Sequence, residues 1–345
     1  MENAPPTSLP PPPPPQWQTL QVATANVLNL ALPGQLFYEG QDAYSAQEHE
    51  RKLSWLGGMV ARLNADVMGF QEVWHEAALK AAVARSGLRN TTVVAPGAEQ
   101  GATGTPRLGL ATRLDVELVE SIIHFVPADH VHVPDLGPHT HFERPVLHAR
   151  LRTRQGLALH VLVVHLKSKR PKYQQNAAGE VIEDRNDPAI TARATLRSLL
   201  MRASEAAALR RVVVDITSRL GAQGGEALVL LGDMNDGPHS VTSQMIAANQ
   251  AVAYDRGARD VALYHAWDVA TEPGLKRDMG YSHVYQGWPE LLDQIWVSEE
   301  FVATSRFAIG DVRRVEVFND HLHESRERWR SDHGFVRALL RLRTG

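Results

Sequence analysis

The chain contains the segment Ala-Leu-Val-Leu-Leu-Gly-Asp-Met-Asn-Asp-Gly-Pro, residues 227–238, in which an apolar run gives way abruptly to polar and turn-forming residues. Residues 227–231 predict a short buried strand. Asp233 and Asn235 follow where the chain enters a turn at Gly237 and Pro238. Asp and Asn commonly form turns, because their side chains bond to nearby backbone groups. A carboxylate and an amide that leave a buried strand are also candidates for catalysis.

Five further polar positions stand beside apolar, strand-like runs elsewhere in the chain. They are Asn26 in the run 20–27, Glu72 in 66–73, His165 at the end of 157–166, Asp293 in 291–297, and Asp332-His333 before 335–342. Burying one such group without a partner costs several kcal/mol. Because strands of a sheet end side by side, we expect these side chains to be partners of one another at one edge.

Several carboxylates at one place repel each other unless a cation lies between them. Oxygen ligands of this kind suit Mg²⁺ or Mn²⁺. Histidines and an Asn beside such a metal supply what phosphate-ester hydrolysis requires, namely donors to the phosphoryl oxygens and groups that handle protons. The pattern therefore predicts a metal-dependent phosphoesterase.

The sequence resembles the endonuclease/exonuclease/phosphatase superfamily, which includes DNase I-like and exonuclease III-like nucleases, sphingomyelinases and inositol-polyphosphate phosphatases. The resemblance covers about residues 20 to 335 and rests on six motifs in the family's order. They are Thr-Ala-Asn-Val (24–27), Phe-Gln-Glu-Val (70–73), Val-His-Leu-Lys-Ser-Lys (164–169), Gly-Asp-Met-Asn-Asp (232–236), Leu-Asp-Gln-Ile (292–295) and Ser-Asp-His (331–333).

The resemblance implies a metal site and a set of catalytic residues. Glu72 would be the main Mg²⁺ (or Mn²⁺) ligand, supported by Asn26 and Asp332. In the catalytic set that the resemblance implies, Asp233 would position or deprotonate the attacking water, and Asn235 would hold the scissile phosphate. His333 would donate to a phosphoryl oxygen, and Asp293 would orient the His333 ring.

His165 matches the histidine that contacts the phosphate or protonates the leaving oxygen in the DNase I-like and sphingomyelinase branches, so the chain resembles that side of the family. Lys167 is a further candidate for substrate binding, although basic residues after a strand are often only solvated. Leu28 stands where many abasic-site nucleases carry a second polar residue, which argues against an abasic-site repair enzyme. His283 and Gln294 lie near the motifs without an assigned role.

The resemblance implies an α/β fold, a four-layer sandwich of two mixed β-sheets packed face to face and flanked by helices. Helical spacing predicts an amphipathic helix over 45–63 and a longer one over 188–220. For the long helix we expect a buried stripe, with its arginines, Arg197 and Arg202 among them, spread over the other faces. The stripe comprises Leu196, Leu199, Ala203, Ala206, Val213 and Leu220.

Composition limits the remaining possibilities. Eight of the 20 prolines lie in the first 15 residues, so residues 1–16 are predicted to be a disordered tail and 17–345 one catalytic domain. The tail lacks the features of a signal peptide and no later stretch has the ~18 apolar residues of a membrane span, which predicts a cytoplasmic protein. The chain has no Cys, which excludes thiolate metal sites and Cys nucleophiles.

Six of the 16 histidines lie between positions 124 and 148. His-x-His pairs on a strand could bind zinc, but the prolines among them favour a His-rich surface loop that lines the cleft.

Three functions follow from these observations. The first is a nuclease that cleaves DNA or RNA with a Mg²⁺-activated water, with nucleic acid as its substrate. The second is a phosphatase or phosphodiesterase acting on a small molecule or lipid head group, for which the net charge of −3 is weak support. The third is a non-catalytic binding scaffold, which the intact set of motif residues disfavours.

Overall fold

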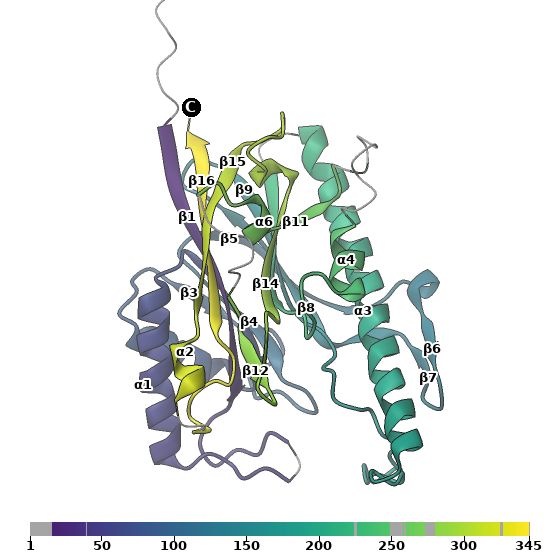
Figure 1. Ribbon diagram of the computed structural model, residues 1–345. Helices are drawn as coiled ribbons and strands as arrows, with labels where there is room; N and C mark the ends of the chain where they lie inside the picture. Colours follow the sequence, from purple (N-terminus) through teal and green to yellow (C-terminus); the bar gives the residue numbers. More distant parts are fainter. Residues whose placement is uncertain are drawn as a thin grey trace, which may run out of the picture.

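Two six-stranded mixed sheets lie face to face, and helices cover their outer faces (Figure 1). This computed structural model describes residues 16–38, 40–223, 226–248, 258, 260–272, 280–324 and 327–344. Of the predicted tail, Gln16 is the first residue of a strand and residues 1–15 lie outside the described part of the chain.

The first sheet has the strand order β15-β16-β1-β2-β4-β3. These strands are β15 (Gly310–Phe318), β16 (Phe335–Thr344), β1 (Gln16–Leu30), β2 (Val67–Val73), β4 (Arg107–Thr112) and β3 (Thr92–Val94). Only β1 and β2 run parallel among the neighbouring pairs. Helices α1 (Ala46–Leu63) and α2 (Glu76–Arg85) cover this sheet (Figure 1).

The second sheet has the order β11-β14-β10-β9-β8-β5. These strands are β11 (Leu263–His265), β14 (Asp293–Ser298), β10 (Glu226–Asp233), β9 (Ala158–His165), β8 (His141–Arg152) and β5 (Asp115–His124). Here β9 and β10 run parallel and the other neighbours antiparallel. Helices α3 (Pro188–Gln223) and α4 (Val241–Ala247) cover its outer face, and α6 (Ala266–Val269) follows β11.

Smaller elements decorate the two sheets. Two hairpins are formed by β6 (Val131–Val133) with β7 (Gly137–His139) and by β12 (His283–Tyr285) with β13 (Trp288–Glu290). Single 3₁₀ turns occur at Pro127–Asp129, Glu299–Phe301 and Asp320–His323. No helix in the described part of the chain is long and apolar enough to cross a membrane.

Three apolar cores separate four layers, which confirms the predicted sandwich. One core lies between the sheets and joins residues such as Val22 and Leu340 to Val163 and Leu231. A second lies under α1 and α2, and a third under α3 and α4. The sheets approach so closely that a Cβ on Gly69 would stand 2.2 Å from the Leu231 side chain.

The strand directions bring the predicted polar residues to one edge. The parallel pairs β1–β2 and β9–β10 end there, whereas β14 and β16, antiparallel to their neighbours, begin there. The register between β1 and β2 shifts between Asn26 and Leu30, and within this bulge Leu28 and Asn29 have positive φ. The strand thus continues to Leu30, beyond the predicted end at residue 27.

The buried face of α3 differs from the prediction. Leu196 and Leu199 are exposed, while Arg197 is fully buried and Arg202 is nearly so. Arg197 is buried because Glu183 and Asp135 meet its guanidinium, at 2.7 and 2.6 Å. The later part of the stripe, Val213 and Leu220, packs on the second sheet as predicted.

The His-rich segment lies largely at the surface, as predicted, with His124, His130, His132 and His141 exposed, but it is not a loop. Most of it forms strands, from the end of β5 to the middle of β8. His139 and His148 are buried. The segment reads as a loop because histidines and prolines interrupt its apolar residues, but strand pairing across β5 and β8 supplies its hydrogen bonds.

Candidate active site

A buried dyad of Asp293 and His333 lies at the centre of the strand edge. The Asp293 carboxylate is 2.7 Å from Nδ1 of His333, and neither side chain has appreciable exposure. Burial by itself would lower the pKa of His333, but the charges of Asp293 and then Asp233 outweigh it and hold this pKa well above the usual value. His333 is therefore cationic at neutral pH, with Nε2 as the free end of its ring.

Asp233 lies beside the dyad at the last position of β10. Its Oδ2 is 3.9 Å from His333 Nε2, 3.4 Å from His165 Nε2 and accepts a hydrogen bond of 3.1 Å from Asn26. Burial raises the pKa of Asp233 to about 6, with Asp293 adding to the rise and His333 opposing it. Residues from β1, from β9 and from the segment before β16 thus converge on one carboxylate of β10, so both sheets contribute to the site.

His165 and Asn235 form one side of this centre. Burial, followed by the charge of Arg144, lowers the pKa of His165 well below its usual value, so its ring is neutral and one nitrogen carries a proton. Asn235 takes a left-handed conformation with φ 51°. Its Nδ2 donates to the Leu166 carbonyl at 2.9 Å, which ties the end of β10 to the end of β9.

Glu72 lies on the opposite side, beside the bulge of β1. Its carboxylate accepts bonds from Asn26 Nδ2 at 3.3 Å and from the Asn29 amide at 3.0 Å. Glu72 has φ 66°, an uncommon conformation for a residue with a side chain and one often found at functional sites. Burial and then the charge of Asp332 raise its pKa.

These residues fit a divalent cation. Glu72 and Asp332 offer carboxylate oxygens, as Mg²⁺ and Mn²⁺ prefer. The Oδ1 of Asn26 is also an oxygen ligand by type, and here it accepts a hydrogen bond of 3.1 Å from the Leu28 backbone amide while Nδ2 faces Glu72. The repulsion between Glu72 and Asp332 that raises the pKa of Glu72 would be relieved by a cation between them. Asp332 is exposed, unlike Asn26, which leaves this side of the site open to solvent.

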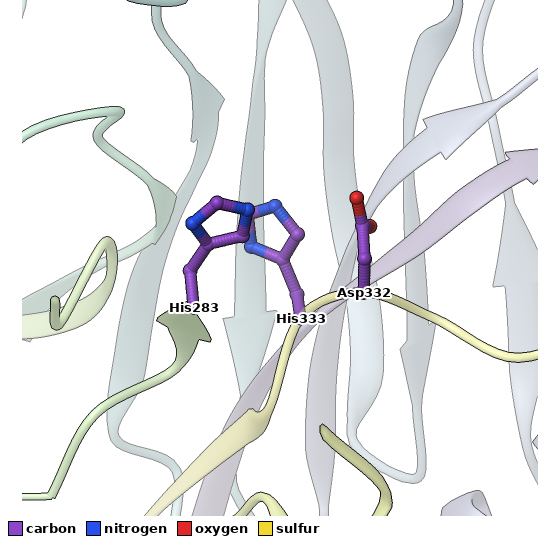
Figure 2. A group of neighbouring side chains, drawn as sticks. All are labelled: His283, Asp332 and His333. Atoms are coloured by element: carbon purple, nitrogen blue, oxygen red, sulfur yellow. The ribbon is translucent and has the colours of Figure 1, made fainter. Parts of the chain in front are cut away.

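His283 joins the site from the β12–β13 hairpin, a position to which the sequence assigned no role. Figure 2 shows its ring beside that of His333, with Asp332 on the other side. The ring centroids of His283 and His333 are 4.8 Å apart, and one ligand atom from each of the three residues falls within 4.8 Å of the others. The backbones of the two histidines also form a β-bridge.

Sequence reasoning missed two basic residues of the site. Lys52 of α1 is fully buried, with its Nζ 3.4 Å from the Arg328 carbonyl, and burial lowers its pKa to about 7 against the opposing charges of Glu72 and Asp332. Helical spacing could have revealed it, because Lys52 lies on the apolar stripe with Leu53 and Leu56. Arg144 at the start of β8 acts on both His165 and Glu72, and no local signal marks it.

The Lys167 side chain folds back onto the backbone of the loop that follows it. Its ammonium lies 3.2 Å from the Ser168 carbonyl and 3.4 Å from that of Arg170, and the side chain is largely buried. Burial lowers its pKa to about 8. This geometry favours a structural role for Lys167 over the predicted contact with substrate.

A four-layer sandwich with this acidic and imidazole centre defines the DNase I-like class of phosphoesterases. Residues 23–333 match the sequence profile of the Endonuclease/Exonuclease/phosphatase family, and the chain belongs to that family. The resemblance inferred from the six motifs is thereby confirmed. Members of the family are phosphoesterases, generally dependent on a divalent metal. No curated protein matches the sequence at a significant level.

Solved structures of low sequence identity share the fold. An endonuclease/exonuclease/phosphatase family protein from Bacteroides thetaiotaomicron is 15% identical with a TM-score of 0.56, covering 95% of this chain and 97% of its own. The mannosyl-6-phosphatase Bt3783 of the same organism is 15% identical with a TM-score of 0.54, over 93% and 99%. Truncated Caenorhabditis elegans TDP2 is 12% identical with a TM-score of 0.52, over 93% and 97%.

Proposed function

We propose that this protein is a divalent-metal-dependent phosphodiesterase that cleaves nucleic acid by direct attack of water. One observation carries the proposal: Asp233 lies within 4 Å of His165, His333 and Asn26, at the edge where both sheets end. A D. rerio TDP2 structure of the same fold is described as a complex with single strand DNA product, which makes nucleic acid a reasonable first substrate to test.

Asn26, Glu72 and Asp332 would hold Mg²⁺ or Mn²⁺. Such an ion neutralises charge on a phosphoryl group and so favours attack by water. Glu72 is fixed for this role by the Asn29 amide and by Asn26, which also contacts Asp233. The side-chain amide of Asn26 therefore links Glu72, the proposed metal ligand, to Asp233, the residue proposed to activate water.

Asp233 would orient the attacking water and accept its proton, since its buried carboxylate lies within 4 Å of both imidazoles, on the Nε2 side of each ring. Asn235 would contact the scissile phosphate, although its amide already donates one bond to Leu166 and must use its second hydrogen. The short link between Asn235 N and the Asp233 carboxylate, 2.8 Å, fixes the two relative to one another.

His333 would stabilise the charge that develops on the phosphoryl oxygens. Its cationic ring is oriented by Asp293 and donates from Nε2. His165 is neutral and would contact the phosphate or the leaving oxygen through its N–H rather than act as a strong acid. Of the two roles implied for this residue, the lowered pKa favours the contact over protonation of the leaving oxygen.

Turnover assays with purified protein test the proposal. The substrates are single- and double-stranded DNA, RNA, bis-p-nitrophenyl phosphate and inositol phosphates, each with Mg²⁺, with Mn²⁺ and with chelator. We expect metal-dependent chain cleavage, and a loss of two or more orders of magnitude in Glu72→Ala, Asp233→Asn and His333→Ala with the fold intact. Near-wild-type activity in His333→Ala would refute the assignment. Inorganic phosphate released without chain cleavage would exclude a nuclease.

The second candidate is a phosphatase or phosphodiesterase acting on a small molecule. It is supported by the net charge of −3 and by a fold shared as closely with a mannosyl-6-phosphatase as with TDP2. The same substrate panel separates the two, because a phosphatase releases phosphate from a monoester and leaves an oligonucleotide at full length.

A further inference from the structure

The β12–β13 hairpin carries two exposed aromatic side chains next to the catalytic centre. Tyr285 is 63% exposed and Trp288 is 77% exposed, among the highest values for large apolar residues in the described part of the chain. The two are direct cross-strand partners in the hairpin. Large aromatic rings open to water usually mark a contact surface.

The strand register places both rings on the same face as His283. His283 pairs with Glu290 and Tyr285 with Trp288, while Val284 and Pro289 form the pair between them. Because side chains alternate between the two faces of a strand pair, the first two pairs share one face.

That face is turned towards the active site. His283 forms a β-bridge with His333, and their rings are 4.8 Å apart, so the His283 side is the His333 side (Figure 2). Glu290, on the same face, forms an ion pair of 2.7 Å with Lys169, which follows the strand that carries His165. A surface thus runs from His333 over His283 to the two aromatic rings.

The hairpin is held rigidly at its base. The Gly334 amide donates to the Ser282 carbonyl at 2.6 Å. The Ser282 hydroxyl accepts bonds from the amides of Leu292 and Asp293 at 3.0 and 2.9 Å. The backbone of the hairpin is therefore anchored beside the catalytic dyad, and this places the two aromatic residues next to it.

We propose that Tyr285 and Trp288 form a stacking platform for a nucleobase adjacent to the scissile phosphate of a single-stranded nucleic acid. This inference rests on the proposed function and specifies its substrate. Tyr285 lies two residues, about 7 Å, beyond His283 along the strand, within reach of the base of a nucleotide whose phosphate is at His333. Base–aromatic stacking tolerates any base, but requires one that is not already stacked in a duplex.

A ligand of the active site fits this surface better than a membrane does. A membrane-inserting hairpin would direct its aromatic side chains away from the protein, whereas here they share the face of His283 and His333. Lys169, whose ammonium lies 2.7 Å from Glu290 on this face, adds a basic side chain beside it, which suits a polyanion.

Binding measurements in the cleavage-deficient Asp233→Asn protein test the platform without turnover. The probes are fluorescein-labelled dT8 and the same oligonucleotide with base-free sugars, in Mg²⁺ at fixed salt. We expect tighter binding of dT8, by about 5- to 150-fold, from one stacked base. Adding Trp288→Ala should remove most of this preference, and Trp288→Phe should retain it.

Trp17→Ala is the matched control, because this tryptophan is 36% exposed and lies nine residues before Asn26, about 30 Å away along β1. The platform is wrong if Trp288→Ala weakens both oligonucleotides equally or neither. It is also wrong if the substitution abolishes pelleting with phosphatidylcholine/phosphatidylserine vesicles while the base preference persists.

The outcome for the proposed function is separate. If the wild-type chain hydrolyses bis-p-nitrophenyl phosphate with metal but Trp288→Ala leaves the base preference intact, only the platform fails. If no phosphoester is hydrolysed at all, the proposed function fails, whatever the binding data show.

Discussion

Replacing Asp293 by Asn tests the electrostatic core of the proposed mechanism. The substitution keeps the shape of a fully buried side chain but removes its charge from a contact of 2.7 Å with His333. The Asn amide can still donate to Nδ1 and leave the proton on Nε2. The ring therefore keeps its donor but loses its positive charge.

The size of the effect follows from the buried pair. Removing one partner of a buried ion pair costs about 3–5 kcal/mol. One pKa unit corresponds to about 1.36 kcal/mol, so the pKa of His333 should fall by about 2–4 units. Since Asp293 raises this pKa, its removal makes the cationic form disappear at a lower pH. Turnover above that lower pKa should drop by about 10²-fold or more.

The assay is hydrolysis of bis-p-nitrophenyl phosphate at saturating Mg²⁺ from pH 5 to 10, for wild type and Asp293→Asn. The alkaline limb of the kcat profile should move to lower pH in the variant, and NMR titration of the His333 ring should show the same shift. Asp311→Asn is the control, because Asp311 is also a buried carboxylate but pairs with Arg341 in the first sheet. An Asp293→Asn profile that coincides with those of wild type and control would refute the reasoning.

Further predictions concern stability and are read from urea unfolding. Substitutions of two adjacent glycines of α1 should change the stability of the protein in opposite directions. Gly57→Ala should destabilise the folded state by about 1–3 kcal/mol, because the added Cβ would lie 2.6 Å from the Arg85 side chain. Gly58→Ala meets no atom within 4 Å and should stabilise the folded state by about 0.5–1 kcal/mol. Equal signs for the pair would contradict the helix packing. Burial lowers the pKa of His139 to about 4. As the pH falls from 6.5 to 4, the His139 ring therefore takes up a proton in the unfolded chain but not in the folded one. The free energy of unfolding should decline over that range by about 3 kcal/mol in the wild type, and by less in His139→Gln. A variant as pH-sensitive as wild type would exclude His139 as the source. Arg197→Met leaves two carboxylates without their cation and should cost about 3–5 kcal/mol; a loss under 1 kcal/mol would contradict a structural ion pair.

Local sequence was sufficient for the strands that carry the site. The runs before Asp233 and His165 are short and almost wholly apolar, as is typical of a strand buried on both faces, and the structure has β10 and β9 there. The first helix could also be predicted from local sequence, because its apolar residues follow helical spacing and Ser45 precedes it as a capping residue. In the structure the Ser45 hydroxyl accepts a hydrogen bond from the backbone amide of Glu48. Six motifs in order then implied the sandwich and its DNase I-like family.

Long-range pairing decided what the sequence left ambiguous. The His-rich segment becomes strand because β8 pairs with both β5 and β9, a partnership that no local pattern records. Arg197 is buried rather than solvated because Glu183, 14 residues before it, and Asp135, 62 residues before it, both contact its guanidinium.

By itself, the sequence determined which polar residues stand beside buried strands, and these are the residues that we propose for phosphoester hydrolysis. Only the tertiary structure decided how they face one another: that Asn26 contacts both Glu72 and Asp233, that His333 is held by Asp293, and that His283 approaches from a hairpin. The physical reason is that apolar periodicity and turn chemistry are local. Charge pairing across two sheets depends on the direction of each strand and on the distance between layers.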